Sequence, residues 1–147
     1  MCYNIAVSET GRLLGVDFGL KRVGLAVCDE TRTLASPLGV YKTKSMRDTI
    51  DYVAALAKKE CVCAIVAGLP LNLDGSESVQ SGRVRAFARN LERVTGLKVE
   101  LVDERLTTVE ADELLIEAGV KSKARRDELV DSLAAKIILQ SYIERGR

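Results

Sequence analysis

The chain has 147 residues, of which 47% are apolar, 29% are charged and 4% are aromatic, and its formal net charge is +1. This length and apolar content favour a single domain, over residues 1–147, with a substantial buried core. The chain has no Trp, which argues against a wide base-stacking surface. Because the net charge is near zero, any binding of nucleic acid must come from local basic patches.

No apolar run approaches the ~20 residues that span a bilayer, and residues 1–11 lack the cationic start and apolar block of a signal peptide. We therefore expect a cytoplasmic protein with no membrane partner, in which residues 1–11 form a loosely ordered lead-in. The four cysteines form no C-x-x-C pair and the chain has no His, so the usual zinc spacings are absent. Without His, proton transfer would have to use carboxylates, Lys or metal-bound water.

The predicted elements begin with a β-hairpin. Two apolar runs, 13–18 and 23–28, flank a tight turn that is bounded by glycines at 19 and 24. A third strand is expected over 34–41. Pro37 interrupts this run, which favours a position at the edge of the sheet.

Helices and strands alternate along the rest of the chain. Apolar runs predict buried strands over 61–69 and 99–102. The alternation predicts parallel strands joined by right-handed crossovers, in an α/β sheet with helices on both faces. Residues 120–126 are rich in Lys and Arg and poor in apolar residues, which predicts an exposed, mobile basic loop. Capping patterns and helical periodicity predict helices over 45–60, over 77–95, from Thr107 to a stop at Gly119, and from near Asp127 onward.

Asp17 is a charged residue inside the first predicted strand, where the pattern calls for an apolar one. An ionised carboxylate at such a place is costly unless a cation or a set of donors compensates it. In one interpretation, local turn amides satisfy Asp17. In the other, it holds a divalent cation at a phosphate-handling site, because Gly15 and Gly19 would let a bulky anion approach the backbone.

Further carboxylates are expected near the same edge of the sheet. Gly68 and the pair Asp103-Glu104 end the two later strands, and ligands of such sheets bind at the carboxyl ends of the central strands. Asp131 lies near the start of the last helix, where its charge either favours the helix dipole or points at Asp17 from a helix packed across the sheet. Converging carboxylates repel one another unless cations lie between them. With phosphate as the third partner, this arrangement is a two-metal phosphodiester site.

Four stretches of sequence also carry a resemblance: GVDFGLKRVG at 15–24, GLPLNLDG at 68–75, DERLTT at 103–108 and VDSLAA at 130–135. Together they resemble the YqgF (RuvX) family, whose members are Holliday-junction-resolvase-like proteins of the RNase H superfamily. The similarity covers residues 13–144. It implies an RNase H-like α/β fold, in which a five-stranded mixed sheet has the order 3-2-1-4-5 and strand 2 is antiparallel.

The resemblance implies that Asp17, Glu104 and Asp131 are catalytic and bind Mg²⁺ or Mn²⁺, with Asp103 as the substitute for Glu104. One ion would activate water and the other would stabilise the leaving oxygen. Gly68 stands where related resolvases carry a carboxylate, and the fifth strand lies ~10 Å from the first, so we expect weak metal binding or assembly around substrate. The residues expected to contact nucleic acid are Lys21, Arg22, Asn72, Ser76, Arg105, Lys121, Lys123, Arg125 and Arg126, together with backbone amides at a helix start over 75–76.

We therefore predict a metal-dependent nuclease that processes the 5′ end of pre-16S ribosomal RNA and associates with a ribosome precursor. One alternative is a noncatalytic or weakly active RNA-binding factor of ribosome biogenesis, which the glycine at 68 favours. Another is a Holliday-junction resolvase that acts on branched DNA. A nucleotide phosphotransferase shares the Asp-x-Gly hairpin, but its second phosphate loop and second domain would not fit in 147 residues. Endonuclease or exonuclease action and the oligomeric state stay open.

Overall fold

The computed structural model describes residues 10–105 and 107–145, with the side chains at 107–110, 112, 127 and 128 left out. Of the lead-in expected over 1–11, residues 1–9 lie outside this range. The strands are β1 (Leu13–Phe18), β2 (Arg22–Cys28), β3 (Ala35–Lys42), β4 (Ala64–Leu69) and β5 (Val99–Asp103). The helices are α1 (Met46–Lys59), α2 (Val79–Thr95), α3 (Thr107–Glu117) and α4 (Lys123–Arg145).

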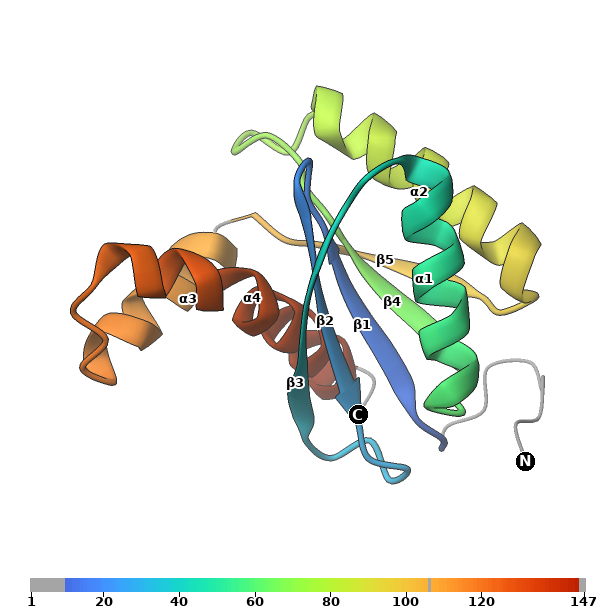
Figure 1. The fold of residues 1–147 in the computed structure, drawn as a ribbon, viewed down its shortest axis with the longest axis horizontal. Helices are drawn as coiled ribbons and strands as arrows, with labels where there is room; N and C mark the ends of the chain where they lie inside the picture. The colour runs from blue at the N-terminus through green and yellow to red at the C-terminus, as the bar shows by residue number, and fades with distance from the viewer. Residues whose placement is uncertain (1–9, 106, 146–147) are drawn as a thin grey trace.

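The strands form one mixed sheet with the order β3-β2-β1-β4-β5 (Figure 1). β2 runs antiparallel to both of its neighbours, whereas β1, β4 and β5 are parallel. The predicted strand order and the antiparallel second strand are therefore confirmed. Because β1, β4 and β5 point the same way, Asp17, Gly68 and Asp103 lie at or near one edge of the sheet.

Burial follows from the position of each strand. All six residues of β4 are buried, as expected for an apolar run between two strands with helices on both faces. β3 lies at the edge, as Pro37 predicted, and its register with β2 shifts between Leu25 and Ala26. β5 forms the opposite edge.

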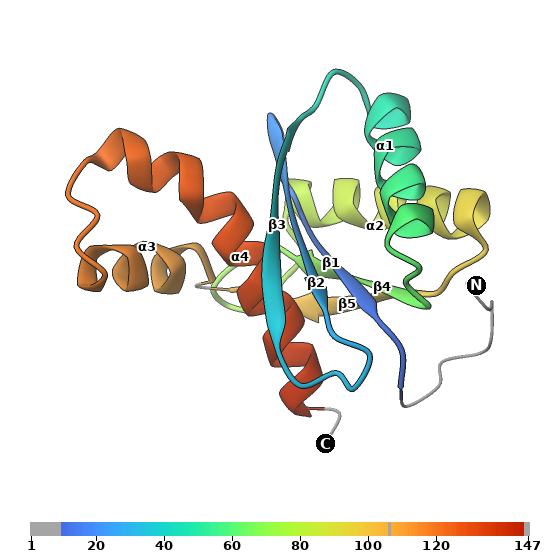
Figure 2. The ribbon, with the colours of Figure 1, turned by 60° about the horizontal axis from the view of Figure 1, so that its bottom comes forward.

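Helices cover both faces of the sheet, as predicted (Figure 2). α1 and α2 lie on one face and bury Val53, Phe87 and Leu91 against the sheet. The rings of Phe18 and Phe87 stack there, with centroids 4.4 Å apart. α4 crosses the other face and buries Ile138 and other apolar side chains against the sheet. None of the helices in the described ranges is long and apolar enough to cross a membrane.

Two helix starts differ from the sequence prediction. α2 begins at Val79 after an N-cap at Ser78, two residues later than expected. α4 begins at Lys123, because the Ser122 hydroxyl accepts a hydrogen bond from the Arg125 amide at 3.3 Å and caps the helix there. The prediction of a basic loop is therefore wrong from residue 123 onward. α3 packs against the first half of α4, and the two helices form a hairpin that extends beyond the sheet (Figures 1 and 2).

Candidate active site

Two carboxyl groups meet at the carboxyl edge of the sheet. Asp17 is the penultimate residue of β1, and Glu104 follows directly after β5. Their side chains are hydrogen-bonded to each other. Two ionised carboxylates in contact repel, so the pair must share a proton or a cation.

Burial is the main reason why the pKa values of both groups are raised. Desolvation raises the pKa of Asp17 to about 6, helped by the negative charge of Asp131 and opposed by the hydrogen bond with Glu104. Desolvation also raises the pKa of Glu104 to about 9, and the adjacent charge of Asp17 acts in the same direction. The pair is therefore a place where a positive charge would be strongly favoured.

Glu104 reaches Asp17 across β4, because Gly68 leaves the space between them free. A Cβ at Gly68 would lie 2.7 Å from Glu104 Oε2 and 2.8 Å from its Cδ. The Glu104 amide donates to the Leu69 carbonyl oxygen at 3.2 Å, which continues the β4–β5 pairing by one residue beyond Asp103. The long side chain thus spans the two strand spacings that separate β5 from β1.

Asp131 approaches the pair from α4. The helix backbone lies directly on β2 at Gly24, where a Cβ would be 1.9 Å from the Asp131 carbonyl oxygen. Asp131 is close enough for its charge to raise the pKa of Asp17. Its own Oδ2 accepts a hydrogen bond from Arg22 Nε at 2.7 Å. The sequence gave no signal for this ion pair, in which Arg22 contacts a protein carboxylate.

A divalent cation fits the chemistry of these groups. Among the described side chains, no three Asp, Glu, Cys or His residues are arranged to hold a metal ion as they stand. The Asp17–Glu104 pair nevertheless consists of two carboxyl groups held in contact, with Asp131 nearby. Carboxylate oxygens are the ligands that Mg²⁺ and Mn²⁺ prefer, and a cation would relieve the repulsion within the pair.

Asp103 has a different partner from Glu104. Arg105 donates to Asp103 Oδ2 through Nε at 2.8 Å, and its backbone amide donates to Oδ1 at 3.0 Å. The Arg105 side chain holds the pKa of Asp103 below its usual range. Arg105 Nη1 also donates to the Leu73 carbonyl oxygen at 3.1 Å, so this residue ties the end of β5 to the loop after β4.

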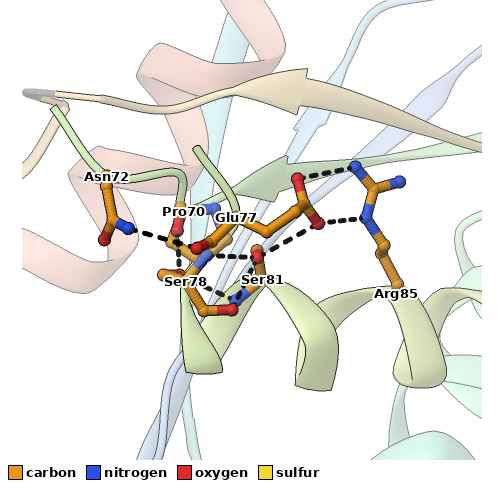
Figure 3. Close-up of polar contacts among 6 residues, drawn as sticks. All are labelled: Pro70, Asn72, Glu77, Ser78, Ser81 and Arg85. Carbon is orange, nitrogen blue, oxygen red and sulfur yellow. Dashed lines mark hydrogen bonds and ion pairs between the residues drawn. The ribbon is translucent and has the colours of Figure 1, made fainter. Parts of the chain in front are cut away.

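The loop between β4 and α2 is held by its own polar groups (Figure 3). Asn72 Nδ2 donates to Ser76 Oγ at 3.0 Å and to the Glu77 carbonyl oxygen at 3.1 Å. The Ser76 amide donates to Asp74 Oδ1 at 2.9 Å, and the Gly75 amide donates to the Asn72 carbonyl oxygen at 2.8 Å. The helix start expected at 75–76 lies at Ser78 instead, and the two amides already have acceptors within the loop.

The other predicted basic residues lie in the turn between β1 and β2 and where α3 and α4 join. Lys21 is exposed in the turn between β1 and β2. Lys121, Lys123 and Arg125 are exposed where α3 and α4 join, and the Arg126 side chain donates to the carbonyl oxygens of 120 and 121. Lys123 lies eight residues before Asp131 on α4, or ~12 Å along the helix axis.

A groove of about 470 Å³ lies between the end of β5, α3 and α4. Arg105 lines it together with Lys136 and Arg145, above apolar residues such as Ile137. Asp17, Glu104 and Asp131 do not line this groove. The sequence analysis did not single out Lys136 or Arg145, because α4 carries many other charged residues, such as Arg126 and Glu144.

Comparison with known proteins identifies the family. A model of the RuvX family, described as Holliday junction resolvase, matches residues 11–145. The chain belongs to the RuvX family. A relative from Syntrophus aciditrophicus (strain SB), named "Putative pre-16S rRNA nuclease", is 46% identical over 133 residues, which cover 90% of this chain and 88% of the relative. A relative of the same name from Paracoccus denitrificans (strain Pd 1222) is 40% identical and is matched over 100% of this chain and 96% of its own length.

Solved structures confirm the RNase H-like fold. T. thermophilus RuvC in complex with Holliday junction substrate superposes with a TM-score of 0.59 at 17% identity, over 92% of this chain and 95% of that chain. The fowlpox virus resolvase in complex with Holliday junction DNA gives a TM-score of 0.57 at 14% identity, over 91% of this chain and 97% of that chain. At these identities the similarity concerns the fold alone.

Proposed function

We propose that this RuvX-family chain is a divalent-metal-dependent nuclease that processes the 5′ end of pre-16S ribosomal RNA. The observation that carries the proposal is the Asp17–Glu104 carboxyl pair, with Asp131 beside it, at the carboxyl edge of an RNase H-like sheet. RNA is favoured over branched DNA because the relatives at 40% and 46% identity are named for pre-16S rRNA, whereas the matching resolvases are 14% and 17% identical.

In this proposal Asp17, Glu104 and Asp131 hold Mg²⁺ or Mn²⁺, while Asp103 stays with Arg105. Bound divalent cations at such sites lower the pKa of water and stabilise a leaving oxygen. Partial burial of the pair lowers the local dielectric constant and strengthens its attraction for a cation. Processing of pre-rRNA would place the protein in the cytoplasm, in association with a ribosome precursor.

The basic residues would bind the RNA backbone. Lys21, in the turn after β1, and Arg105, next to Glu104 in the sequence, would neutralise phosphates next to the scissile bond. The basic residues around Lys123, at the end of the α3–α4 hairpin, would contact the RNA strand ~12 Å from Asp131, measured along the axis of α4. Such contacts do not read sequence, so affinity should fall steeply with salt concentration.

The test is a cleavage assay with the purified full chain and a precursor RNA that carries the extended 5′ end of 16S rRNA. We expect cleavage in Mg²⁺ or Mn²⁺, none in EDTA, and at least ~100-fold slower cleavage by Asp17→Asn with an unchanged circular dichroism spectrum. RNA labelled at either end separates internal cleavage from stepwise trimming. Cleavage that persists in EDTA, or in Asp17→Asn, would contradict the proposal.

The same assay decides between the alternatives. RNA with the mature 5′ end and a four-way DNA junction are offered in parallel with the precursor RNA. Binding of the precursor RNA without cleavage would identify a noncatalytic RNA-binding factor. Cleavage of the junction alone would identify a resolvase, in line with the description of the family as Holliday junction resolvase.

A further inference from the structure

Arg22 and Asp131 form an ion pair at the rim of the carboxyl cluster. The Arg22 Nε atom lies 2.7 Å from Asp131 Oδ2, and the two side chains are 43% and 24% exposed. An ion pair this accessible to solvent is weak. Arg22 can therefore leave Asp131 at little cost when either partner finds a better one.

The backbone around the pair is fixed, so only the side chains can exchange partners. Arg22 and Gly24 are two residues apart on β2, and they therefore face the same side of the sheet. At Gly24 the strand touches the α4 backbone so closely that a Cβ would lie 1.9 Å from the Asp131 carbonyl oxygen. The helix has no room to move toward β2, and the carboxylate must change partner by rotating its side chain.

Asp131 has two neighbours that bear on cation binding. Its charge acts on Asp17, so a cation held by Asp17 would also attract the Asp131 carboxylate. The same carboxylate is bound by Arg22. A metal ion bound at Asp17 and the Arg22 guanidinium would thus compete for the Asp131 carboxylate.

We propose that Arg22 is an exchangeable counter-ion: it pairs with Asp131 until a divalent cation binds, and it then contacts a phosphate of the RNA backbone. This inference rests on the proposed nuclease function. Arg22 is suited to it because a guanidinium binds carboxylate and phosphate oxygens with the same planar donors. Arg22 is then a positioning residue that couples metal binding to substrate binding.

The proposal predicts opposite effects of one substitution on two ligands. Arg22→Gln removes the internal competitor, so Mn²⁺ should bind the protein about twofold to fivefold more tightly. The same variant should bind precursor RNA more weakly in the presence of a divalent cation, with a salt dependence reduced by about one phosphate contact. In EDTA, where Arg22 stays on Asp131, the variant and the wild type should bind RNA almost equally.

The experiment titrates Mn²⁺ into the full chain without RNA, by calorimetry, and measures RNA binding at several salt concentrations in Ca²⁺ and in EDTA. Lys42→Gln is the matched control, because Lys42 is exposed and lies opposite Arg22 on β3. Lys42→Gln removes the same charge as Arg22→Gln, but not a residue that pairs with Asp131. Its Mn²⁺ affinity should therefore change by less than half as much as that of Arg22→Gln. Arg22→Lys, which keeps the charge, should restore an affinity close to that of the wild type.

The outcomes separate this inference from the proposed function. Wild-type protein that binds no Mn²⁺ would overturn both. Wild-type protein that binds Mn²⁺ with an affinity that Arg22→Gln leaves unchanged or weakens would overturn the exchange alone. Thermal unfolding of each variant checks that the fold is retained.

Discussion

Glu104 Oε2 lies 2.7 Å from the place where a side chain on Gly68 would begin. The Glu104 carboxylate, at the end of β5, thus occupies the space above Gly68 on the neighbouring strand β4. The sequence resemblance placed a carboxylate of related resolvases at position 68. Here the Glu104 carboxylate reaches the same region from the end of β5, and it can do so because position 68 is a glycine.

Moving the carboxylate from position 104 to position 68 tests this relationship. Gly68→Asp alone should displace Glu104, because the new Cβ would meet both Oε2 and the Ile138 Cδ1 atom, the latter at 2.6 Å. We expect at least ~10-fold weaker Mn²⁺ binding and slower cleavage. Gly68→Asp combined with Glu104→Ala removes the collision with Glu104, leaves only the end of the flexible Ile138 side chain to move, and keeps one carboxylate at the site, so it should recover much of the loss.

Gly68→Ala with Glu104→Ala is the control, since it removes the same collision and supplies no carboxylate. Calorimetry of Mn²⁺ binding and the cleavage rate are the two measurements. If the control recovers as well as the double variant with Asp, the space above Gly68 matters for packing alone.

The sequence predicted the sheet and its functional edge because these depend on patterns within each segment. The apolar run of β4 indicated a strand buried on both faces, and Asp17 stood out as a charge within such a run. The longer side chain of Glu104 favours it over Asp103 as the metal-facing residue. Its contact with Asp17 over Gly68 could not be predicted, because ~10 Å between strands describes the backbone and says nothing of a side chain lying over a glycine.

Contacts between distant segments were likewise outside the reach of sequence. Arg22 and Asp131 are 109 positions apart, and either charge alone is typical of a surface residue. The α4 start was missed for a local reason: the row of cations up to Arg126 suggested a loop, but the Ser122 cap allows a helix that carries cations in its first turn.

Stability should fall as pH rises in the absence of divalent cations. Asp17 and Glu104 have raised pKa values in the folded state, about 6 and about 9, so the folded chain binds more protons than the unfolded chain above pH ~4. Their stabilisation is present below the unfolded pKa values and is lost as pH rises through the folded ones. Each unit of raised pKa corresponds to ~1.4 kcal/mol, so we expect a loss on the order of a few kcal/mol between pH 5 and pH 9.

Urea unfolding in EDTA at these two pH values measures this loss. Glu104→Gln removes one titrating group and places a neutral amide beside Asp17, so its stability should depend much less on pH than that of the wild type. A wild-type chain that is more stable at pH 9 than at pH 5 would contradict the raised pKa values.

The two adjacent acidic residues should differ in their effect on metal binding. Glu104 is in contact with Asp17, whereas Asp103 is neutralised by Arg105. Glu104→Gln is expected to weaken Mn²⁺ binding at least ~10-fold, since a charged ligand is lost. Asp103→Asn should change it less than ~2-fold and should act instead on the loop that Arg105 holds through Leu73. Equal effects of both variants in calorimetry would show that the pair acts as one unit.

The close packing of α4 on β2 predicts that a Gly→Ala substitution has opposite effects on stability at two positions. Gly24→Ala places a Cβ against the Asp131 carbonyl oxygen, a backbone atom that can move only with the helix. We therefore expect the free energy of unfolding to fall by ~1–3 kcal/mol or more, and Mn²⁺ to bind more weakly because Asp131 is displaced. Gly82→Ala is the control: its Cβ would meet no atom within 4 Å on the exposed side of α2, and a helical Gly→Ala change stabilises by ~0.5–1 kcal/mol. Urea unfolding measures both changes. A Gly24→Ala variant as stable as the wild type would mean that the helix can retreat from β2, in which case Asp131 is not held at the site by this contact.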